Sequence, residues 1–158
     1  MPSPIEGGQV QQSGLDTRLS QLNQDAGART TMLITKQGNC IVSVGDLTYL
    51  NVTAISALVA GMFSATQEVA RLVGEDHFSI LLQQGEKRNI HISLVDDSMM
   101  LVIIFDDAMA MGKVRYVARK ALRNIADAYS STRVEKEIDG DKFKEFAISL
   151  IDRIFEEK

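Results

Sequence analysis

The chain has 158 residues, of which 45% are hydrophobic and 24% charged, and its formal net charge is -4. This composition is typical of a globular domain, and the length predicts one domain with short extensions. A single cysteine excludes an internal disulfide framework, and the acidic balance argues against a general nucleic-acid-binding protein. Residues 1–14 lack the basic start and apolar stretch of a secretory signal, and no apolar run approaches the ~18 residues of a membrane span. We therefore expect a cytoplasmic protein that does not insert into membranes.

The first part of the chain combines a polar arm, a helix and a hairpin. Residues 1–14 are rich in Gly, Gln, Ser and Pro and offer little to bury, so we expect a disordered arm. Leucines recur at helical spacing over residues 15–22, which predicts a short amphipathic helix. Two β-branched and apolar runs, residues 31–35 and 40–44, flank a turn that contains glycine and predict a β-hairpin.

The middle of the chain combines one long helix with three strands. Residues 51–73 form the longest helical segment, and Asn51 is a suitable N-cap because its side chain can accept a hydrogen bond from the first turn. Strands are then expected over 78–84, 89–94 and 99–105. The last of these is apolar at every position, which indicates a strand in the middle of a sheet and buried on both faces.

Two further helices complete the order of elements. An apolar stripe runs along residues 113–129, and a second amphipathic segment begins at residue 141. We predict an α+β fold for residues 15–130, with a five-stranded antiparallel sheet and helices on both of its faces. Residues 131–140 are expected to form a linker, and residues 141–158 a C-terminal amphipathic helix.

The long helix carries more apolar surface than a single sheet can cover. One strip is expected to pack on the sheet and contains Ile55, Leu58, Met62, Val69 and Val73. A second strip needs another partner, which we expect to be a second copy of the chain: Val52, Val59, Phe63 and Ala70. The first strand of the meander is expected at a sheet edge and is hydrophobic at Ile80, Leu81 and Leu82. Both features predict a homodimer.

Two other surfaces allow a structural or a functional interpretation. The third sector of the long helix is small in its middle, at Ala57, Ala60, Gly61 and Ser64. It is either a solvated helix back or a surface that another protein approaches closely. The helix over 113–129 carries a basic cluster: Lys113, Arg115, Arg119, Lys120 and Arg123. That cluster is either a solvated face or a patch that steers an acidic partner.

The C-terminal amphipathic helix has too much apolar surface to remain in water. Its apolar side chains fall at helical spacing and are Phe143, Phe146, Ala147, Leu150, Ile151, Ile154 and Phe155. Either this helix docks on its own domain or dimer, or the preceding linker lets it reach a groove on a partner.

Residues that could carry catalysis are few and scattered. His77 and His91 have no second histidine, cysteine or carboxylate at a metal-ligand spacing. Cys40 lacks the basic neighbour that would activate a thiol. The aspartate pairs at 96–97 and 106–107 fall where turns favour this residue, and no glycine-rich phosphate-binding motif is present. We therefore expect no metal, no cofactor and no enzymatic activity of the chain itself.

Three stretches of the sequence resemble the roadblock/dynein light chain family, and most of all its MglB-like bacterial branch. They are the hairpin LITKQGN, the helix AISALVAGMFSATQEVARLVGE and the run VDDSMMLVIIFDDAMAMGKVRYVARKA. The likeness spans about residues 15–130, and the C-terminal helix is similar more loosely. The resemblance implies a homodimer, built on the long helix and the edge strand, that binds a GTP-loaded Ras-like small GTPase.

The resemblance also implies a mode of action and a contact surface. Such a regulator stimulates GTP hydrolysis without an arginine finger, by moving the GTPase's own Arg and Gln to the nucleotide. The contact is expected on the small sector of the long helix, at Ala57, Ala60, Gly61, Ser64, Ala65 and Glu68. It is extended to the basic helix at Arg115, Arg119, Lys120 and Arg123. The C-terminal segment is expected to contact the GTPase and to affect nucleotide exchange, in a process such as bacterial cell polarity or motility.

Two other functions fit the same pattern. A roadblock scaffold could hold a GTPase or a protein complex without any effect on hydrolysis. A sheet with helices on both sides could also enclose a small ligand, as in PAS-like sensor domains. The scarcity of polar side chains at core positions argues against the sensor, because a specific pocket needs a few convergent polar groups.

Overall fold

The computed structural model describes residues 6–129 and residue 148 of the chain, with side chains described from residue 14 onwards. The described residues up to 126 belong to one compact unit, and residues 127–129 and 148 belong to another. The linker predicted over 131–140 lies outside the described residues. The C-terminal helix predicted over 141–158 also lies outside them, apart from position 148.

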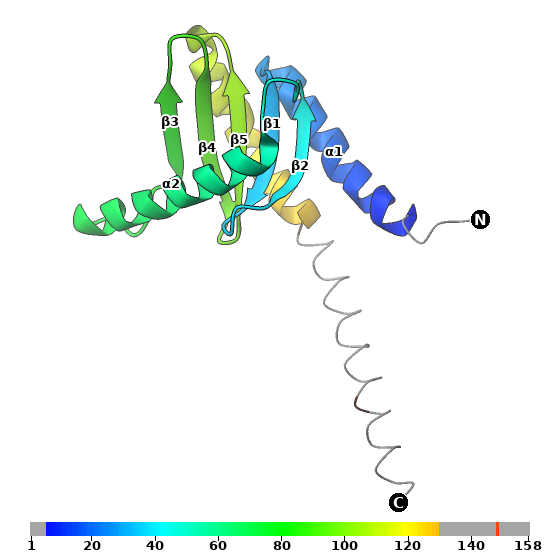
Figure 1. Cartoon of the computed structure of the whole chain (residues 1–158), viewed down its shortest axis with the longest axis horizontal. Coiled ribbons are helices and arrows are strands. Elements are labelled where there is room, and N and C mark those ends of the chain that lie inside the picture. Colours follow the sequence, from blue (N-terminus) through cyan, green and yellow to red (C-terminus); the bar gives the residue numbers. More distant parts are fainter. Residues whose placement is uncertain (1–5, 130–147, 149–158) are drawn as a thin grey trace, which may run out of the picture. The chain divides into compact units, whose positions relative to one another are not determined.

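The observed elements follow the predicted order (Figure 1). They are α1 (Glu6–Ala26), β1 (Thr30–Thr35), β2 (Cys40–Gly45), α2 (Val52–Leu72), β3 (Ile80–Gln84), β4 (Asn89–Asp96), β5 (Met99–Phe105), the 3-10 turn η1 (Ala108–Ala110) and a helix over residues 111–129. All strand pairs are antiparallel, and the sheet order is β2-β1-β5-β4-β3. The predicted five-stranded antiparallel sheet is therefore confirmed.

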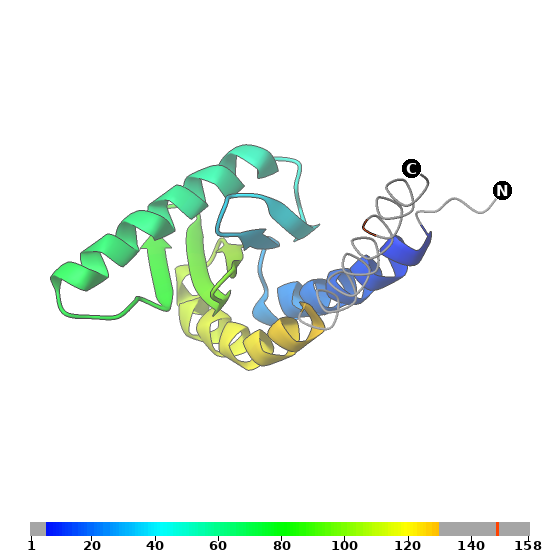
Figure 2. The same cartoon turned by 90° about the horizontal axis from the view of Figure 1, so that it is seen from below.

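The helices cover both faces of this sheet, as predicted. Figure 2 shows α2 on one face, with α1 and the helix over residues 111–129 on the other. The central strand β5 pairs with both β1 and β4 and is buried at every position. An apolar strand in this place contributes side chains to two cores, which explains the absence of any polar residue between Met99 and Phe105.

Helix α1 begins earlier in the chain than expected. Helix α1 begins at Glu6, so residues 6–14, which composition marked as disordered, belong to a helix. The helix is anchored further along, where its buried face against the sheet consists of Leu15, Leu19, Leu22 and Ala26. Extending an existing helix costs less than nucleating one, and this explains how a weakly helical sequence joins α1.

One end of the sheet is held together by Arg29, which precedes β1. Its guanidinium donates hydrogen bonds to Asp106 after β5, at 2.7–3.0 Å, and to Asp46 after β2, at 3.0 Å. The guanidinium groups of Arg29 and Arg88 both lie over the ring of Tyr49, at 5.4 and 4.2 Å from its centroid. The segment between β2 and α2, which contains Asp46 and Tyr49, therefore contacts the connection before β1, the β3–β4 turn and, through Arg29, the connection after β5.

The polar side of β4 is buried beneath the helix over residues 111–129. His91 is only 1% exposed, and neither of its ring nitrogens has a hydrogen-bond partner in the part of the chain that the structure describes. Burial, and to a smaller extent the positive charge of Arg115, lower the pKa of His91 from its usual 6.5 to about 4. The imidazole is therefore neutral in the folded protein at pH 7.

This burial predicts that acid destabilises the fold through His91. The unfolded chain binds a proton below pH about 6.5, whereas the folded chain does so only near pH 4, so stability falls as the pH decreases between these values. We expect the free energy of unfolding to drop by about 2 kcal/mol between pH 7 and pH 5 through this group. Urea unfolding of His91→Leu should show a correspondingly flatter pH profile. The exposed His77 provides the matched control, and a His77→Leu profile as flat as that of His91→Leu would contradict the assignment.

Candidate partner-binding surface

Helix α2 is capped at both ends, and two of its hydroxyl side chains donate hydrogen bonds to backbone carbonyls of the same helix. The Asn51 side chain accepts a hydrogen bond from the Ala54 amide at 3.0 Å, and Gly74 follows the last turn with a positive φ of 85°. The Ser56 hydroxyl donates to the Val52 carbonyl, and the Thr66 hydroxyl to the carbonyls of Met62 and Phe63. The hydrogen-bonding needs of these hydroxyls are therefore met within the helix, and they require no partner on the surfaces around it.

The two apolar strips of α2 are placed the opposite way from the prediction. Val59, Phe63 and Ala70, expected in a dimer interface, are buried on the chain's own sheet, and Val52 packs at the edge of the same core. The strip expected on the sheet is divided. Leu58 is 72% exposed, and Val69 and Val73 are also exposed, while Ile55 and Met62 are half-buried beside the core.

Small residues explain which strip faces the sheet. Ser56 is fully buried and Ala60 nearly so, and both lie on the same side of the helix as Phe63. Small side chains at these positions let the helix backbone approach the strands, and the large Phe63 then fills the space beside them. The strip that contains Leu58, Val69 and Val73 has no small member, and these three side chains remain outward.

A seam of small and apolar side chains, interrupted by Glu68, runs along the outward side of α2. Its exposed members follow a spacing of four, three, four, three and four residues, and they are Ala54, Leu58, Gly61, Ala65, Glu68 and Leu72. Such spacing is the pattern by which one helix packs along another. Leu72 is 87% exposed, and with Val69 and Val73 it makes the C-terminal end of the helix the most apolar part of this side.

The C-terminal end of α2 lies beside the free edge of the sheet. Strand β3 is an edge strand, as predicted, and Ile80, Leu81 and Leu82 are half-buried in it. Figures 1 and 2 show the last turns of α2 extending past β3. Within the described residues, an unpaired strand edge and an exposed apolar helix end thus occur at the same side of the domain.

The small sector of α2 has two parts with different roles. Ala57 and Ala60 lie under the β1–β2 turn, where a Cβ on Gly38 would be 3.0 Å from the Cα of Ala57 and 3.5 Å from the Cβ of Ala60. Ala60 is consequently buried, so its expected contact with a partner is wrong. The packing of the chain's own hairpin accounts for the small size of Ala60, whereas Ala57 meets the turn through its backbone and its side chain is exposed.

The rest of the small sector is open to solvent. Gly61, Ser64 and Ala65 are exposed, and nothing in the described part of the chain lies within 4 Å of a Cβ built on Gly61. Glu68 at the end of this sector is exposed and forms an ion pair with Arg71 one turn further on. The flat surface that another protein could approach is therefore centred on residues 61–65.

The basic residues do not join this surface. Arg115, Arg119, Lys120 and Arg123 lie on the helix over residues 111–129, which covers the opposite face of the sheet from α2 (Figure 2). The prediction that combined both sets into one contact is wrong for a single chain. Sequence spacing gave no signal for this separation, because it depends on which face of the sheet each helix crosses.

The potential metal ligands and the single thiol of the described residues are scattered. No three His, Cys, Asp or Glu side chains among them are grouped so that they could hold a metal ion. Burial raises the pKa of the Cys40 thiol, which is half-buried against the α2-side core. Among these residues α2 alone is long and apolar enough to cross a membrane, but a helix that lies on a sheet passes the same test of length and composition.

Comparison with known proteins identifies the family of this fold. The model of the Roadblock/LC7 domain family matches residues 15–105. The structure of Myxococcus xanthus MglB is 28% identical with a TM-score of 0.72, and the match covers 75% of this chain and 97% of that one. The gliding protein MglB from Thermus thermophilus is 25% identical, with a TM-score of 0.69 over 83% of this chain and 94% of that one. A search of curated proteins found no match.

A more distant structure shares the fold alone. The Roadblock/LC7 domain from Streptomyces avermitilis is 15% identical with a TM-score of 0.62, and the match covers 73% of this chain and 97% of that chain. The similarity to MglB structures extends beyond the family match at residue 105, because it covers three quarters or more of the chain.

The close approach of the β1–β2 turn to α2 predicts a large effect at Gly38. This residue has a φ of +92°, and a methyl group there would press against the backbone of Ala57. We expect Gly38→Ala to lower the free energy of unfolding by about 1–3 kcal/mol in chemical denaturation. Gly14→Ala is the matched control, because Gly14 is helical with open space around it, and it should stabilise the chain slightly. Equal stability of the two variants would contradict the packing described here.

Proposed function

The chain belongs to the Roadblock/LC7 domain family, and from that membership we propose that it is a regulatory protein that binds a Ras-like small GTPase. The observation that carries the proposal is the outward side of α2. This long surface is apolar and small, and the described part of the chain does not cover it. Surfaces of this kind mark sites of protein–protein contact.

The proposed protein acts as a homodimer. The exposed end of α2, formed by Val69, Leu72 and Val73, lies at the same side as the free edge of β3. A second copy that pairs its β3 with this edge would continue the sheet and cover the exposed helix end at the same time. Self-association has a precedent among the similar structures, one of which is described as MglB with tetrameric arrangement.

The proposed GTPase contact is the small surface around Gly61, Ser64 and Ala65. Small side chains let a partner backbone approach closely, and the apolar methyl and methylene groups around them exclude water from the contact. The partner that the family resemblance favours is an MglA-like GTPase in its GTP-bound state. The process is cell polarity or motility in the cytoplasm of a bacterium.

Stimulation of hydrolysis is proposed to occur by positioning. Phosphoryl transfer depends mostly on the placement of groups around the nucleotide, so a regulator can accelerate it by fixing the conformation of the GTPase. The exposed α2 surface around Ser64 supplies shape rather than charge, which agrees with a mechanism in which the GTPase's own Arg and Gln act. A scaffold without effect on hydrolysis would use the same surface, and a turnover assay with the cognate GTPase distinguishes the two.

Blocking the small surface predicts loss of function without loss of fold. Ser64→Arg places a long cation where a partner backbone is expected to approach, and the buried charge would be costly in the complex. We expect Ser64→Arg to abolish both GTPase binding and the stimulation of hydrolysis. Ser20→Arg on the exposed side of α1 is the matched control and should retain both. If the Ser64→Arg variant stimulated GTP hydrolysis normally, the proposed contact would be wrong.

A second variant tests the dimer separately. Leu72→Glu introduces a charge at the exposed end of α2, so sedimentation at micromolar concentration should show monomers with an unchanged circular dichroism spectrum. Met109→Glu is the control, because Met109 is equally exposed but lies on η1 outside the proposed interface. A monomeric wild-type chain, or a Leu72→Glu variant that remains dimeric, would exclude this arrangement.

A further inference from the structure

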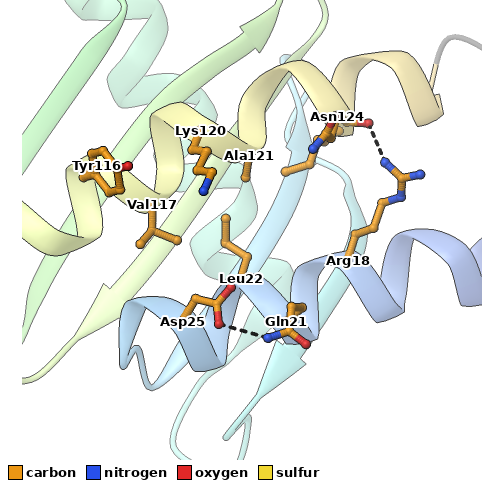
Figure 3. Close-up of a pocket in the computed structure, with 10 residues that line it drawn as sticks. Arg18, Gln21, Leu22, Asp25, Tyr116, Val117, Lys120, Ala121 and Asn124 are labelled. Carbon is orange, nitrogen blue, oxygen red and sulfur yellow. Dashed lines mark hydrogen bonds between the residues drawn. The ribbon is translucent and has the colours of Figure 1, made fainter.

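A groove runs between α1 and the helix over residues 111–129, on the face of the sheet opposite α2. Its volume is about 640 Å³, and it is open to solvent on its outer side. Figure 3 shows the side chains that line it from the two helices. The α1 wall extends from Arg18 to Asp25, and the other wall from Tyr116 to Ile125, so the walls are about two and about three helical turns long.

The lining of this groove combines an apolar floor with a polar rim. The floor consists of Leu22, Val117, Ala121 and Ile125. At one end the Arg18 guanidinium donates to the carbonyl of Asn124 at 3.1 Å, and near the other end the Gln21 amide donates to Asp25 at 2.9 Å. An open trough between two helices, with an apolar floor of this length, has the shape that receives a third helix.

The charge on the rim favours an acidic occupant. Figure 3 shows the Lys120 side chain directed into the space between the helices, toward Leu22. No carboxylate among the side chains described over residues 14–129 lies within ion-pair distance of Lys120 or Arg18, and the single acid of the lining, Asp25, already accepts from Gln21. Three exposed arginines on the same helix, Arg115, Arg119 and Arg123, do not line the groove but add to the positive field, in a chain whose net charge is -4. Such a local excess steers acidic partners.

We propose that this groove is a second docking site, distinct from the α2 surface, for an acidic amphipathic helix of a partner protein. Apolar side chains on two successive turns of the incoming helix occupy the floor over Leu22 and Ala121. Its flanking carboxylates pair with Lys120 and Arg18 on the rim. Tyr116, exposed at the end of the floor, supplies an aromatic side chain that the bound helix would cover. Because the two surfaces lie on opposite faces of the sheet, both partners can bind at once.

The test uses the full-length chain and a defined probe. The probe is a stapled helical peptide of about 14 residues with leucines on one face and glutamates on the other, and a second peptide carries lysines in place of the glutamates. Binding is followed by amide chemical shifts and by calorimetry. We expect the acidic peptide to shift the resonances of residues that line the groove, and the lysine peptide to bind at least about tenfold more weakly.

Substitutions at neighbouring positions make the test specific. Lys120→Glu should weaken binding of the acidic peptide by about tenfold or more. Arg119→Glu is the matched control, because it makes the same charge change at the next residue, which is exposed but does not line the groove. It should leave the affinity within about twofold, apart from a small change in salt dependence.

Three outcomes would overturn the proposal. The first is an absence of shifts in the groove at millimolar peptide, and the second is equal binding of the acidic and lysine peptides. In the third, groove resonances move on dilution of the protein alone, which would identify a second copy of the chain as the occupant. None of these results bears on the α2 surface, which Ser64→Arg tests independently.

Discussion

The packing of one side of α2 on the sheet determines the rest of the functional geometry. Ser56 and Ala60 bring the helix close to the strands, and Phe63 and Val59 fill the core beside them. A helix has a fixed angular relation between its faces, so this contact also fixes which side chains point outward. The seam from Ala54 to Leu72 is exposed because the opposite side has the better fit to β1, β4 and β5.

Two binding faces follow from a single sheet. The central strand β5 is apolar on both sides, so a helix layer must cover each of them, and the two layers cannot share a surface. The α2 layer offers small and apolar side chains around Ser64, whereas the α1 layer offers a trough with cations at its rim. Their different chemistry favours different partners, and their separation lets each be altered without disturbing the other.

Sequence patterns predicted the fold better than they predicted the surfaces. The order of elements and the central position of β5 came from periodicity and from one wholly apolar strand, because these depend on local spacing. The sequence predicts the wrong strip of α2 against the sheet because both strips are apolar. Only the shape of the sheet determines which strip packs on it. The sequence also places Ala60 in the partner contact, although Gly38 packs close to it in the chain's own fold. Gly38 lies more than twenty positions earlier, and local spacing does not reveal such a tertiary contact.

The small residues of α2 show that a row of small side chains in a sequence does not by itself indicate a binding site. The structure is needed to distinguish internal packing from contact with a partner. Ala60 is small because the chain's own hairpin packs against it, and this constraint would exist without any partner. Gly61, Ser64 and Ala65 have no such neighbour within the described residues, so internal packing does not require their size. Glycine in the middle of a helix lowers its stability by roughly 0.5–1 kcal/mol relative to alanine. A helix that retains Gly61 on its outward side, beside exposed leucines, therefore accepts a cost that close approach by a partner would explain.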